Sequence, residues 1–211
     1  ASGLGRACAE AICKNGGYVA ILDMNEKLGH EVVQSLPYGK SKFFSVDVTQ
    51  SVSIAHAVKG IRRWTQETQK ATGGVIAAAG VPNPGKIIDR HQNPLPIEDF
   101  DFVMNVNVRG TVDLIRQILP DISKNNPVGE DGERGIIVMV SSAAAFDGQT
   151  GQVAYAASKG ALTSLTLPMT RDLSRYGIRV VTIAPGLFDS GMTALMGEKV
   201  RTSISKVLQF P

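Results

Sequence analysis

Residues 135–160 read GIIVMVSSAAAFDGQTGQVAYAASKG, and the rest of the chain is organised around them. The apolar, β-branched run IIVMV predicts a buried strand that ends at a serine pair, Ser141 and Ser142. A Gly-rich loop follows, and then a helical stretch that carries Tyr155 and Lys159. These two residues are spaced i and i+4, so they lie on one face of the helix, one turn apart. The stretch therefore predicts a strand, a loop and a helix that bring three polar groups together.

A hydroxyl, a phenol and an amine in this arrangement can form an acid–base site. A tyrosine phenol has a pKa near ~10 and is a poor base at neutral pH. A nearby ammonium such as that of Lys159 stabilises the phenolate and lowers this pKa, and the Ser142 hydroxyl can point at the same place. We therefore expect proton transfer to or from an alcohol or a carbonyl. Taken alone, the spacing of Tyr155 and Lys159 is more typical of an ordinary surface helix, so the specificity has to come from the rest of the chain.

Helical and strand-like segments alternate along the chain. Helices are predicted at residues 3–15, 26–36, 51–71, 97–124, 152–176 and 197–208, and strands at residues 18–22, 43–46, 75–79, 135–141 and 180–184. This alternation predicts an α/β fold, a doubly wound parallel sheet of the Rossmann type with helices on both faces, in three α/β/α layers. Residues 1–211 are expected to form a single domain, with Ser51 as the N-cap of its third helix. In such a sheet ligands bind at the carboxyl ends of the strands.

The composition argues against several classes of function. Hydrophobic residues make up 43% of the 211 residues and charged residues 19%, with a mean hydropathy of +0.03. The net charge of +3 is too small to indicate nucleic-acid binding, and no apolar run approaches the ~20 residues that span a bilayer. Cys8 and Cys13 on one predicted helix suggest neither a disulfide nor a metal site, and three scattered histidines are expected at the surface. We expect an intracellular protein that binds small molecules, with no metal, no membrane insertion and no nucleic acid.

The start of the chain has features of a nucleotide site. Gly3 and Gly5 open the first helix, where glycines let the backbone approach a pyrophosphate and the helix N-terminus favours its charge. Asp23 follows the next strand, where a carboxylate accepts hydrogen bonds from an adenosine ribose and repels a 2′-phosphate. Met24 comes next and is uncharged, so NAD is preferred over NADP, and Arg6 is expected to lie along the first helix. Alternatively, the glycines are turn residues and Asp23 caps the helix after it.

An ordered set of motifs runs through the chain, namely Gly3-x-Gly5, Asp23, Asn107, Ser142, Tyr155-x-x-x-Lys159 and Pro185-Gly186. With this set the chain resembles the short-chain dehydrogenase/reductase family. The family has a T-G-x-x-x-G-x-G motif and a seven-stranded sheet of strand order 3-2-1-4-5-6-7. Only the tail of the motif is present, at residues 1–5, and the family's first and last strands have no counterpart. We therefore expect both ends of the chain to be truncated.

The resemblance implies roles for individual residues. Tyr155 is the general base in oxidation and the general acid in reduction, Lys159 lowers its pKa and binds the nicotinamide ribose, and Ser142 orients the substrate oxygen. Asn107 kinks the long helix and holds a water that relays protons to Lys159. Cofactor contacts are implied for Ser2, Gly3, Leu4, Gly5, Asp23, Asp47, Val48, Ala78, Ala79, Gly80, Tyr155, Lys159, Pro185, Gly186, Phe188 and Ser190. Substrate contacts are implied for Ser142, Gln152 and Tyr155.

The chain departs from the family pattern at two places. The family usually has Asn-Asn-Ala-Gly after its fourth strand, whereas this chain has Ala-Ala-Ala-Gly ending at Gly80, so we expect a local loss of support and no loss of the site. Ser190 stands where close relatives carry threonine and retains the hydroxyl, while Asp189 beside it could perturb the carboxamide end of the cofactor. Leu195 and Met196 are candidates for an apolar substrate wall, or equally for ordinary packing of a lid.

Three segments resemble one subgroup of the family, namely residues 146–162, 166–173 and 177–188. This subgroup consists of mitochondrial, NAD-dependent homotetramers that oxidise short and branched 3-hydroxyacyl-CoA and also steroid alcohols. The resemblance therefore implies an enzyme that converts 3-hydroxyacyl-CoA to 3-oxoacyl-CoA, with a hydroxysteroid or a small ketone as alternative substrate. It implies a mitochondrial location, with the cytoplasm as the alternative. A non-catalytic scaffold and an inactive fragment are the competing interpretations.

Overall fold

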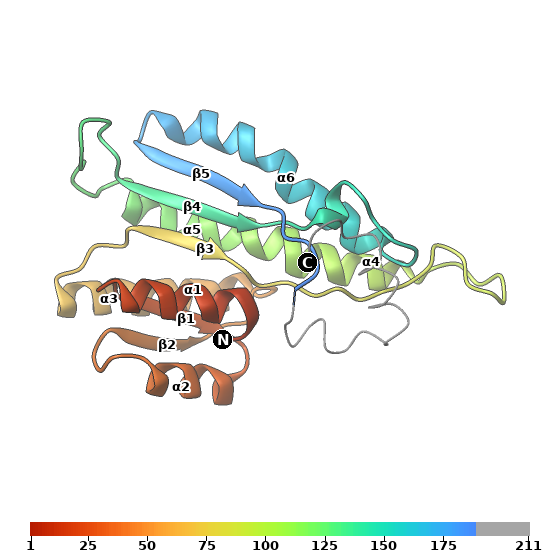
Figure 1. Ribbon diagram of the computed structural model, residues 1–211, viewed down its shortest axis with the longest axis horizontal. Coiled ribbons are helices and arrows are strands. Elements are labelled where there is room, and N and C mark those ends of the chain that lie inside the picture. Colours follow the sequence, from red (N-terminus) through yellow and green to blue (C-terminus); the bar gives the residue numbers. More distant parts are fainter. Residues whose placement is uncertain (189–211) are drawn as a thin grey trace.

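The computed structural model describes residues 1–188, in which helices and strands alternate as predicted (Figure 1). The strands are β1 (Val19–Asp23), β2 (Ser41–Ser45), β3 (Gly74–Ala77), β4 (Gly135–Val140) and β5 (Ile178–Ile183). The helices are α1 (Gly3–Lys14), α2 (Glu26–Ser35), α3 (Ser51–Thr68), α4 (Ile97–Met104), α5 (Thr111–Ile122) and α6 (Val153–Ser174). A π-helical segment, η1 (Asn105–Gly110), joins α4 to α5, and a 3-10 turn, η2 (Ala143–Ala145), follows β4. The described part of the chain thus has the predicted α/β fold.

The described strands form two parallel sheets, one of β1 and β2 and one of β3, β4 and β5. Ile137 in the middle of β4 lies between Val75 of β3 and Val180 of β5. Figure 1 shows the strands in the order β2, β1, β3, β4, β5, all pointing the same way. The neighbouring edges of β1 and β3 are not paired with each other. This is the position at which we expect the family's first strand.

Helices cover both sides of these sheets. On one side α3, α5 and α6 bury a large apolar cluster whose fully enclosed members include Ile54, Ile115, Ile122, Ile137, Met139 and Leu162. On the other side α1 and α2 pack on β1 and β2 through a smaller cluster of Ala9, Ile21 and Val32. The packed layers leave the carboxyl ends of the strands open, which is where ligands bind in this class of fold.

Several predicted boundaries need correction, among them the end of β3, which lies at Ala77 and not at residue 79. The prediction of Ser51 as an N-cap is wrong, because Gln50 holds that position and Ser51 is the first residue of α3. The Ser51 hydroxyl instead accepts hydrogen bonds from Arg116 Nη2 (3.3 Å) and Gln117 Nε2 (3.2 Å), which tie α3 to α5. Strand β5 begins at Ile178, earlier than predicted, because its pairing with β4 extends to that residue.

The long helix predicted at 97–124 is interrupted by the π-helical segment η1 and ends at Ile122. Asn107, in the middle of η1, is fully buried. Gly110 closes the segment against Val48, and a Cβ on this glycine would come within 2.9 Å of Val48 atoms. Such single π-helical turns inside α-helices are frequent at functional sites.

The predicted helix at 197–208 and the predicted site residues Asp189, Ser190, Leu195 and Met196 lie outside the described residues. Within residues 1–188, none of the helices is both long enough and apolar enough to cross a membrane.

Candidate active site

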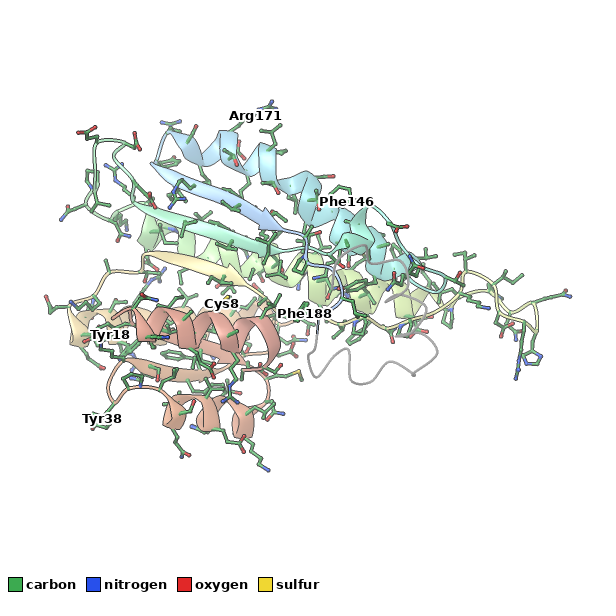
Figure 2. The ribbon with its side chains drawn as sticks, in the orientation of Figure 1. Cys8, Tyr18, Tyr38, Phe146, Arg171 and Phe188 are labelled. Carbon is green, nitrogen blue, oxygen red and sulfur yellow. The ribbon has the colours of Figure 1, made fainter. Side chains whose placement is uncertain are left out.

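A cavity of about 1090 Å³ opens at the carboxyl ends of the strands and reaches between β1 and β3. Ligand pockets typically measure about 300–1,000 Å³, and part of this volume is the space between the unpaired edges of β1 and β3. Phe188 lines the cavity at the carboxyl ends of the strands, and Tyr18 lines it at the amino end of β1 (Figure 2). The lining includes every described residue predicted for the site except Asn107, namely Ser2, Gly3, Leu4, Gly5, Asp23, Asp47, Val48, Ala78, Ala79, Gly80, Ser142, Gln152, Tyr155, Lys159, Pro185, Gly186 and Phe188.

The N-terminus of α1 forms one wall of this cavity. Gly3 begins the helix with a φ of 48°, in the left-handed region that favours glycine. A Cβ on Gly5 would lie 3.5 Å from the side chain of Ala78, so α1 packs closely on the segment after β3. Arg6 lies along the helix as expected, and its Nε donates to Glu10 Oε1 (2.7 Å). The first N–H groups of α1 have no partner within the helix, which suits an anionic ligand.

Asp23 ends β1 at the edge of the cavity. Its Oδ1 accepts a hydrogen bond from the backbone N–H of Asn25 (2.9 Å). Asn25 caps α2, because its side chain accepts the backbone N–H of Leu28 (3.0 Å). The alternative that Asp23 caps this helix is therefore wrong. The carboxylate lies at the strand end, on the side of the cavity that holds the first turn of α1.

Tyr155 and Ser142 both line the cavity, and their side chains are hydrogen-bonded to each other. Burial raises the pKa of the Tyr155 phenol, and a hydrogen bond with the Ser142 side chain acts in the opposite direction. Ser142 follows β4, and its Oγ also accepts the backbone N–H of Ala144 in the turn η2 (3.2 Å). The strand end and the first turns of α6 thus bring a hydroxyl and a phenol together, as the sequence predicts.

Lys159 lies behind Tyr155 and is almost fully buried. Its Nζ donates to the backbone carbonyl of Val140 (2.8 Å) and lies 5.5 Å from the centroid of the Tyr155 ring. Burial lowers the pKa of Lys159 to about 8. Burial outweighs the Ser142 bond and raises the pKa of Tyr155, and the predicted lowering of this pKa by Lys159 stays a prediction.

Asn107 does not line the cavity but lies directly behind its wall. Its Oδ1 accepts the backbone N–H of Val81 (2.8 Å), and its Nδ2 donates to the carbonyl of Val81 (3.0 Å) and to Ser158 Oγ (2.9 Å). Gly80 separates this amide from the cavity, because a Cβ there would lie 3.3 Å from both Asn107 Oδ1 and Lys159 Nζ. The predicted kink at Asn107 coincides with η1, whereas its predicted water relay to Lys159 stays a prediction.

The mouth of the cavity is built from two segments joined by their backbones. The N–H of Gly85 donates to the carbonyl of Gly151 (2.8 Å), which attaches the segment 81–96 to the loop before α6. Beyond this attachment the segment projects from the molecule (Figure 1). Gln152 lines the mouth as predicted, but its Oε1 accepts the backbone N–H of Gln149 (2.8 Å), so its side chain also shapes its own loop.

Sequence reasoning missed several residues of this site. Val81, Pro82, Ala143, Asp147 and Gln149 also line the cavity. The buried hydroxyls of Ser141 and Ser158 were also missed, although a serine inside a helix without a partner is unfavourable and could have been a signal. Among the described residues, no group of three or more His, Cys, Asp or Glu side chains could hold a metal ion.

Comparisons with known proteins agree with this geometry. A family model described as short chain dehydrogenase matches residues 1–201. The chain is 42% identical over 216 residues to 3-hydroxyacyl-CoA dehydrogenase type-2 of Drosophila melanogaster, covering 100% of this chain and 81% of that protein. It is 37% identical over 213 residues to the protein of the same name from Bos taurus, covering 100% of this chain and 79% of that one. The chain therefore belongs to the short chain dehydrogenase family and is an oxidoreductase, and the predicted subgroup is confirmed.

Solved structures give the same result for the fold. The crystal structure of 3-hydroxyacyl-CoA dehydrogenase type-2 from Mycobacterium avium matches with a TM-score of 0.88 and 30% sequence identity, covering 100% of this chain and 79% of that chain. A 3-ketoacyl-(acyl-carrier-protein) reductase from Brucella melitensis, solved in complex with NADH, matches with a TM-score of 0.80 at 24% identity, covering 96% of this chain and 78% of that chain. The predicted doubly wound, three-layer fold is therefore confirmed.

Proposed function

We propose that this protein is an NAD-dependent dehydrogenase that interconverts a 3-hydroxyacyl-CoA and a 3-oxoacyl-CoA. One observation carries the proposal, namely that Tyr155, Ser142 and Lys159 line the same cavity as the N-terminus of α1 and Asp23. An acid–base group and a nucleotide site that share one cavity are what hydride transfer to a nicotinamide requires. The names of the relatives, at 42% and 37% identity, support the choice of substrate.

The residues around the cavity fit NAD. Gly5 lets α1 approach the segment after β3, and the first turn of α1 favours the charge of a pyrophosphate. Gly80 leaves room beside Lys159 that a side chain would fill. Asp23 at the end of β1 can accept hydrogen bonds from the adenosine ribose. The carboxylate would repel a 2′-phosphate, so NAD is favoured over NADP.

In the oxidation, Ser142 and Tyr155 act on the alcohol group. The Ser142 hydroxyl orients the substrate oxygen, and the Tyr155 phenolate accepts the proton that leaves this oxygen. The chemistry that bound NAD would supply is an acceptor for the hydride that leaves the carbon bearing this oxygen. The Lys159 ammonium lies 5.5 Å from the centroid of the Tyr155 ring, and a cation at this place favours the ionised form of the phenol. In the reduction Tyr155 returns the proton to the carbonyl oxygen.

The segment 81–96 supports an acyl-CoA substrate. It is attached at Gly85 to the loop that carries Gln149 and Gln152, so it extends the mouth of the cavity. Lys86 and Arg90 on this exposed segment are cationic, which suits the phosphates of coenzyme A. A steroid alcohol offers no such anionic group, and it is therefore the second candidate.

The proposal includes a homotetramer in the mitochondrion. Exposed apolar side chains on α4 and α6 support self-association, since Phe102, Val153 and Leu167 are 47%, 43% and 56% exposed. Light scattering of the purified protein tests the assembly, because a monomeric mass would contradict it. Imaging of the tagged full-length protein beside a mitochondrial marker tests the location.

A substrate comparison tests the proposed function. The formation of reduced nicotinamide is measured with NAD or NADP and with 3-hydroxybutyryl-CoA, free 3-hydroxybutyrate or a hydroxysteroid. We expect the highest kcat/KM for the CoA thioester with NAD. Free 3-hydroxybutyrate is the matched control, because it carries the same alcohol without the coenzyme. A higher kcat/KM for the hydroxysteroid than for the thioester would reverse the order of the two candidate substrates. No turnover with any of these substrates would refute the proposal.

A further inference from the structure

We propose that Ser158 is a positioning residue for Tyr155, and that its hydroxyl connects the buried Asn107 to the backbone of the tyrosine. The inference rests on the proposed function, since it assigns Ser158 a role in placing the acid–base group. Ser158 lies in α6 between Tyr155 and Lys159 and is completely buried. It does not touch the cavity, so any effect on the reaction passes through a neighbour.

Two hydrogen bonds define this connection. Asn107 Nδ2 donates to Ser158 Oγ (2.9 Å), and Ser158 Oγ donates in turn to the backbone carbonyl of Tyr155 (2.7 Å). A hydroxyl has one proton to donate and lone pairs to accept, so Ser158 uses both abilities at once. The bond to Tyr155 is local to the helix, whereas the bond from Asn107 comes from η1, 51 residues away in the sequence.

Asn107 anchors the other end of the connection. Its oxygen accepts from the N–H of Val81, and its second N–H donates to the carbonyl of the same residue. Both N–H groups and the oxygen of the amide are therefore engaged. Val81 itself lines the cavity beside Gly80. A continuous series of hydrogen bonds thus runs from the cavity wall after β3, through Asn107 and Ser158, to Tyr155.

A second set of hydroxyls holds the same turn of α6, with Ser141 following β4 and Thr163 within α6 itself. Ser141 Oγ donates to the carbonyl of Lys159 (2.7 Å), and Thr163 Oγ1 donates to the same carbonyl (3.1 Å). These bonds fix Lys159, whereas the bond of Ser158 is the one that ends on Tyr155. Loss of the Ser158 hydroxyl removes the tie between Tyr155 and η1 and leaves a buried N–H of Asn107 without its acceptor.

The consequence for Tyr155 has a definite direction. The Ser142 hydrogen bond lowers the pKa of the phenol against the effect of burial, and it requires the ring to be held near the end of β4. A less well fixed Tyr155 loses part of this bond, so its pKa rises further. In the oxidation the phenolate is the active form, and the acidic limb of the pH profile of kcat should move to higher pH.

The test compares the purified Ser158→Ala variant with the wild type. We expect kcat to fall by about ten- to a hundredfold, since misplacement of a reacting group by about 1 Å has an effect of that order. The KM values for NAD and substrate should stay within about twofold, and the acidic limb should move to higher pH. The pKa of Tyr155 is also measured without turnover, by ultraviolet titration of its phenol. The titration curve of Tyr155→Phe is subtracted from that of the wild type, and the curve of the double variant Tyr155→Phe/Ser158→Ala is subtracted from that of Ser158→Ala.

Thr166→Val provides a matched control. Thr166 lies further along α6, and its hydroxyl donates to the carbonyl of Leu162 (3.3 Å) and bonds with Thr182 Oγ1 (2.6 Å). This change removes a comparable helix hydroxyl and should lower the melting temperature while leaving kcat and the pH profile unchanged. If Ser158→Ala behaves in the same way as Thr166→Val, the positioning role is refuted and Ser158 only stabilises the fold.

Two additional variants, Ser158→Cys and Tyr155→Phe, cover a Ser158→Ala protein that does not fold and a failure of the proposed function. If Ser158→Ala does not fold, Ser158→Cys keeps the volume and a weak donor, and an intermediate kcat with a smaller pH shift would support the role. A Cys variant identical to wild type in both measurements would overturn it. If Tyr155→Phe retains full activity, the proposed function itself fails. If Tyr155→Phe is inactive but Ser158→Ala has the kcat and pH profile of the wild type, only this inference fails.

Discussion

The two ends of the cavity are held in place in different ways. At the catalytic end, Asn107, Ser158 and Lys159 are buried and engaged in hydrogen bonds, and they rest on the three-stranded sheet. At the nucleotide end, Asp23 closes a strand of the two-stranded sheet and remains part-exposed, and Met24 after it is 74% exposed. The catalytic end is therefore preorganised by the protein, whereas the nucleotide end offers groups that a ligand can still engage.

This difference predicts how substitutions at the two ends should behave. Changes at the preorganised end should affect the chemical step and leave cofactor affinity unchanged. Changes at the nucleotide end should affect affinity for the cofactor and leave kcat at saturation unchanged. The predictions below test this division, beginning with the largest effect.

Tyr155→Phe should have the largest effect. The change removes only the phenol oxygen, so kcat should fall by about 10²–10⁴-fold, which is the usual contribution of a general acid or base. Steady-state kinetics of 3-hydroxybutyryl-CoA oxidation measure this loss, and the quenching of protein fluorescence measures the Kd for NAD. The Kd should be unchanged. A Tyr155→Phe enzyme with weak NAD binding and a normal kcat would break the proposed division of the cavity.

The pH dependence of stability should reveal the buried amine of the catalytic end. The pKa of Lys159 is lowered from 10.5 to about 8 by burial, so between these pH values the unfolded chain holds a proton that the folded chain has lost. Stability therefore rises with pH across this window, by at most about 3 kcal/mol from this group. Below about pH 8 the cost of burying the charge is fully present.

Lys159→Met isolates this effect, because it keeps the length of the side chain without the charge. Urea unfolding of both proteins is measured at several pH values, and titrating groups that do not interact with Lys159 cancel in the difference. The wild type should gain stability relative to Lys159→Met as the pH rises from about 8 to 10.5. A constant difference across this range would mean that Lys159 is not desolvated in the folded protein.

Asp23→Asn should have a smaller effect, and this effect should be on cofactor affinity at the nucleotide end of the cavity. The change keeps an oxygen for the backbone N–H of Asn25 and removes the charge that favours the ribose. Hydrogen bonds to charged groups contribute about 1.5–3 kcal/mol, so the Kd for NAD should rise by about 10- to 100-fold. Titration calorimetry with NAD and NADP measures both affinities, and the preference for NAD should shrink. A fall in kcat at saturating NAD would contradict the division.

The sequence predicted the parts of the molecule that depend on local pattern. Apolar periodicity was sufficient to predict the alternation of helices and strands. The order of the motifs predicted that Gly3, Asp23, Ser142 and Tyr155 belong to one site, and these residues line one cavity. Strand ends at a glycine or a charged residue were close to the observed ones. The start of β5 was predicted too late, because its length is set by its pairing with β4.

Contacts between distant segments could not be predicted in the same way. The partners of Asn107 are Val81 and Ser158, which lie 26 and 51 residues away and meet only in the folded chain. The hydrogen bond from Lys159 to Val140 has the same origin, since the two residues lie 19 positions apart in the sequence. Ser51 was assigned as a cap from its local position, although its partners come from α5.

Arg6→Ala should have the smallest effect and sharpens the description of the nucleotide end. Arg6 lines the cavity, but its Nε is paired with Glu10 (2.7 Å) and its side chain is 43% exposed. An exposed i,i+4 pair contributes about 0.3–0.5 kcal/mol, so the free energy of unfolding should fall by no more than this amount. The Kd for NAD should stay within about twofold, in contrast to Asp23→Asn. A large loss of NADP affinity without a change for NAD would show that Arg6 leaves Glu10 to contact a 2′-phosphate, and Asp23 would then not determine the choice of cofactor alone.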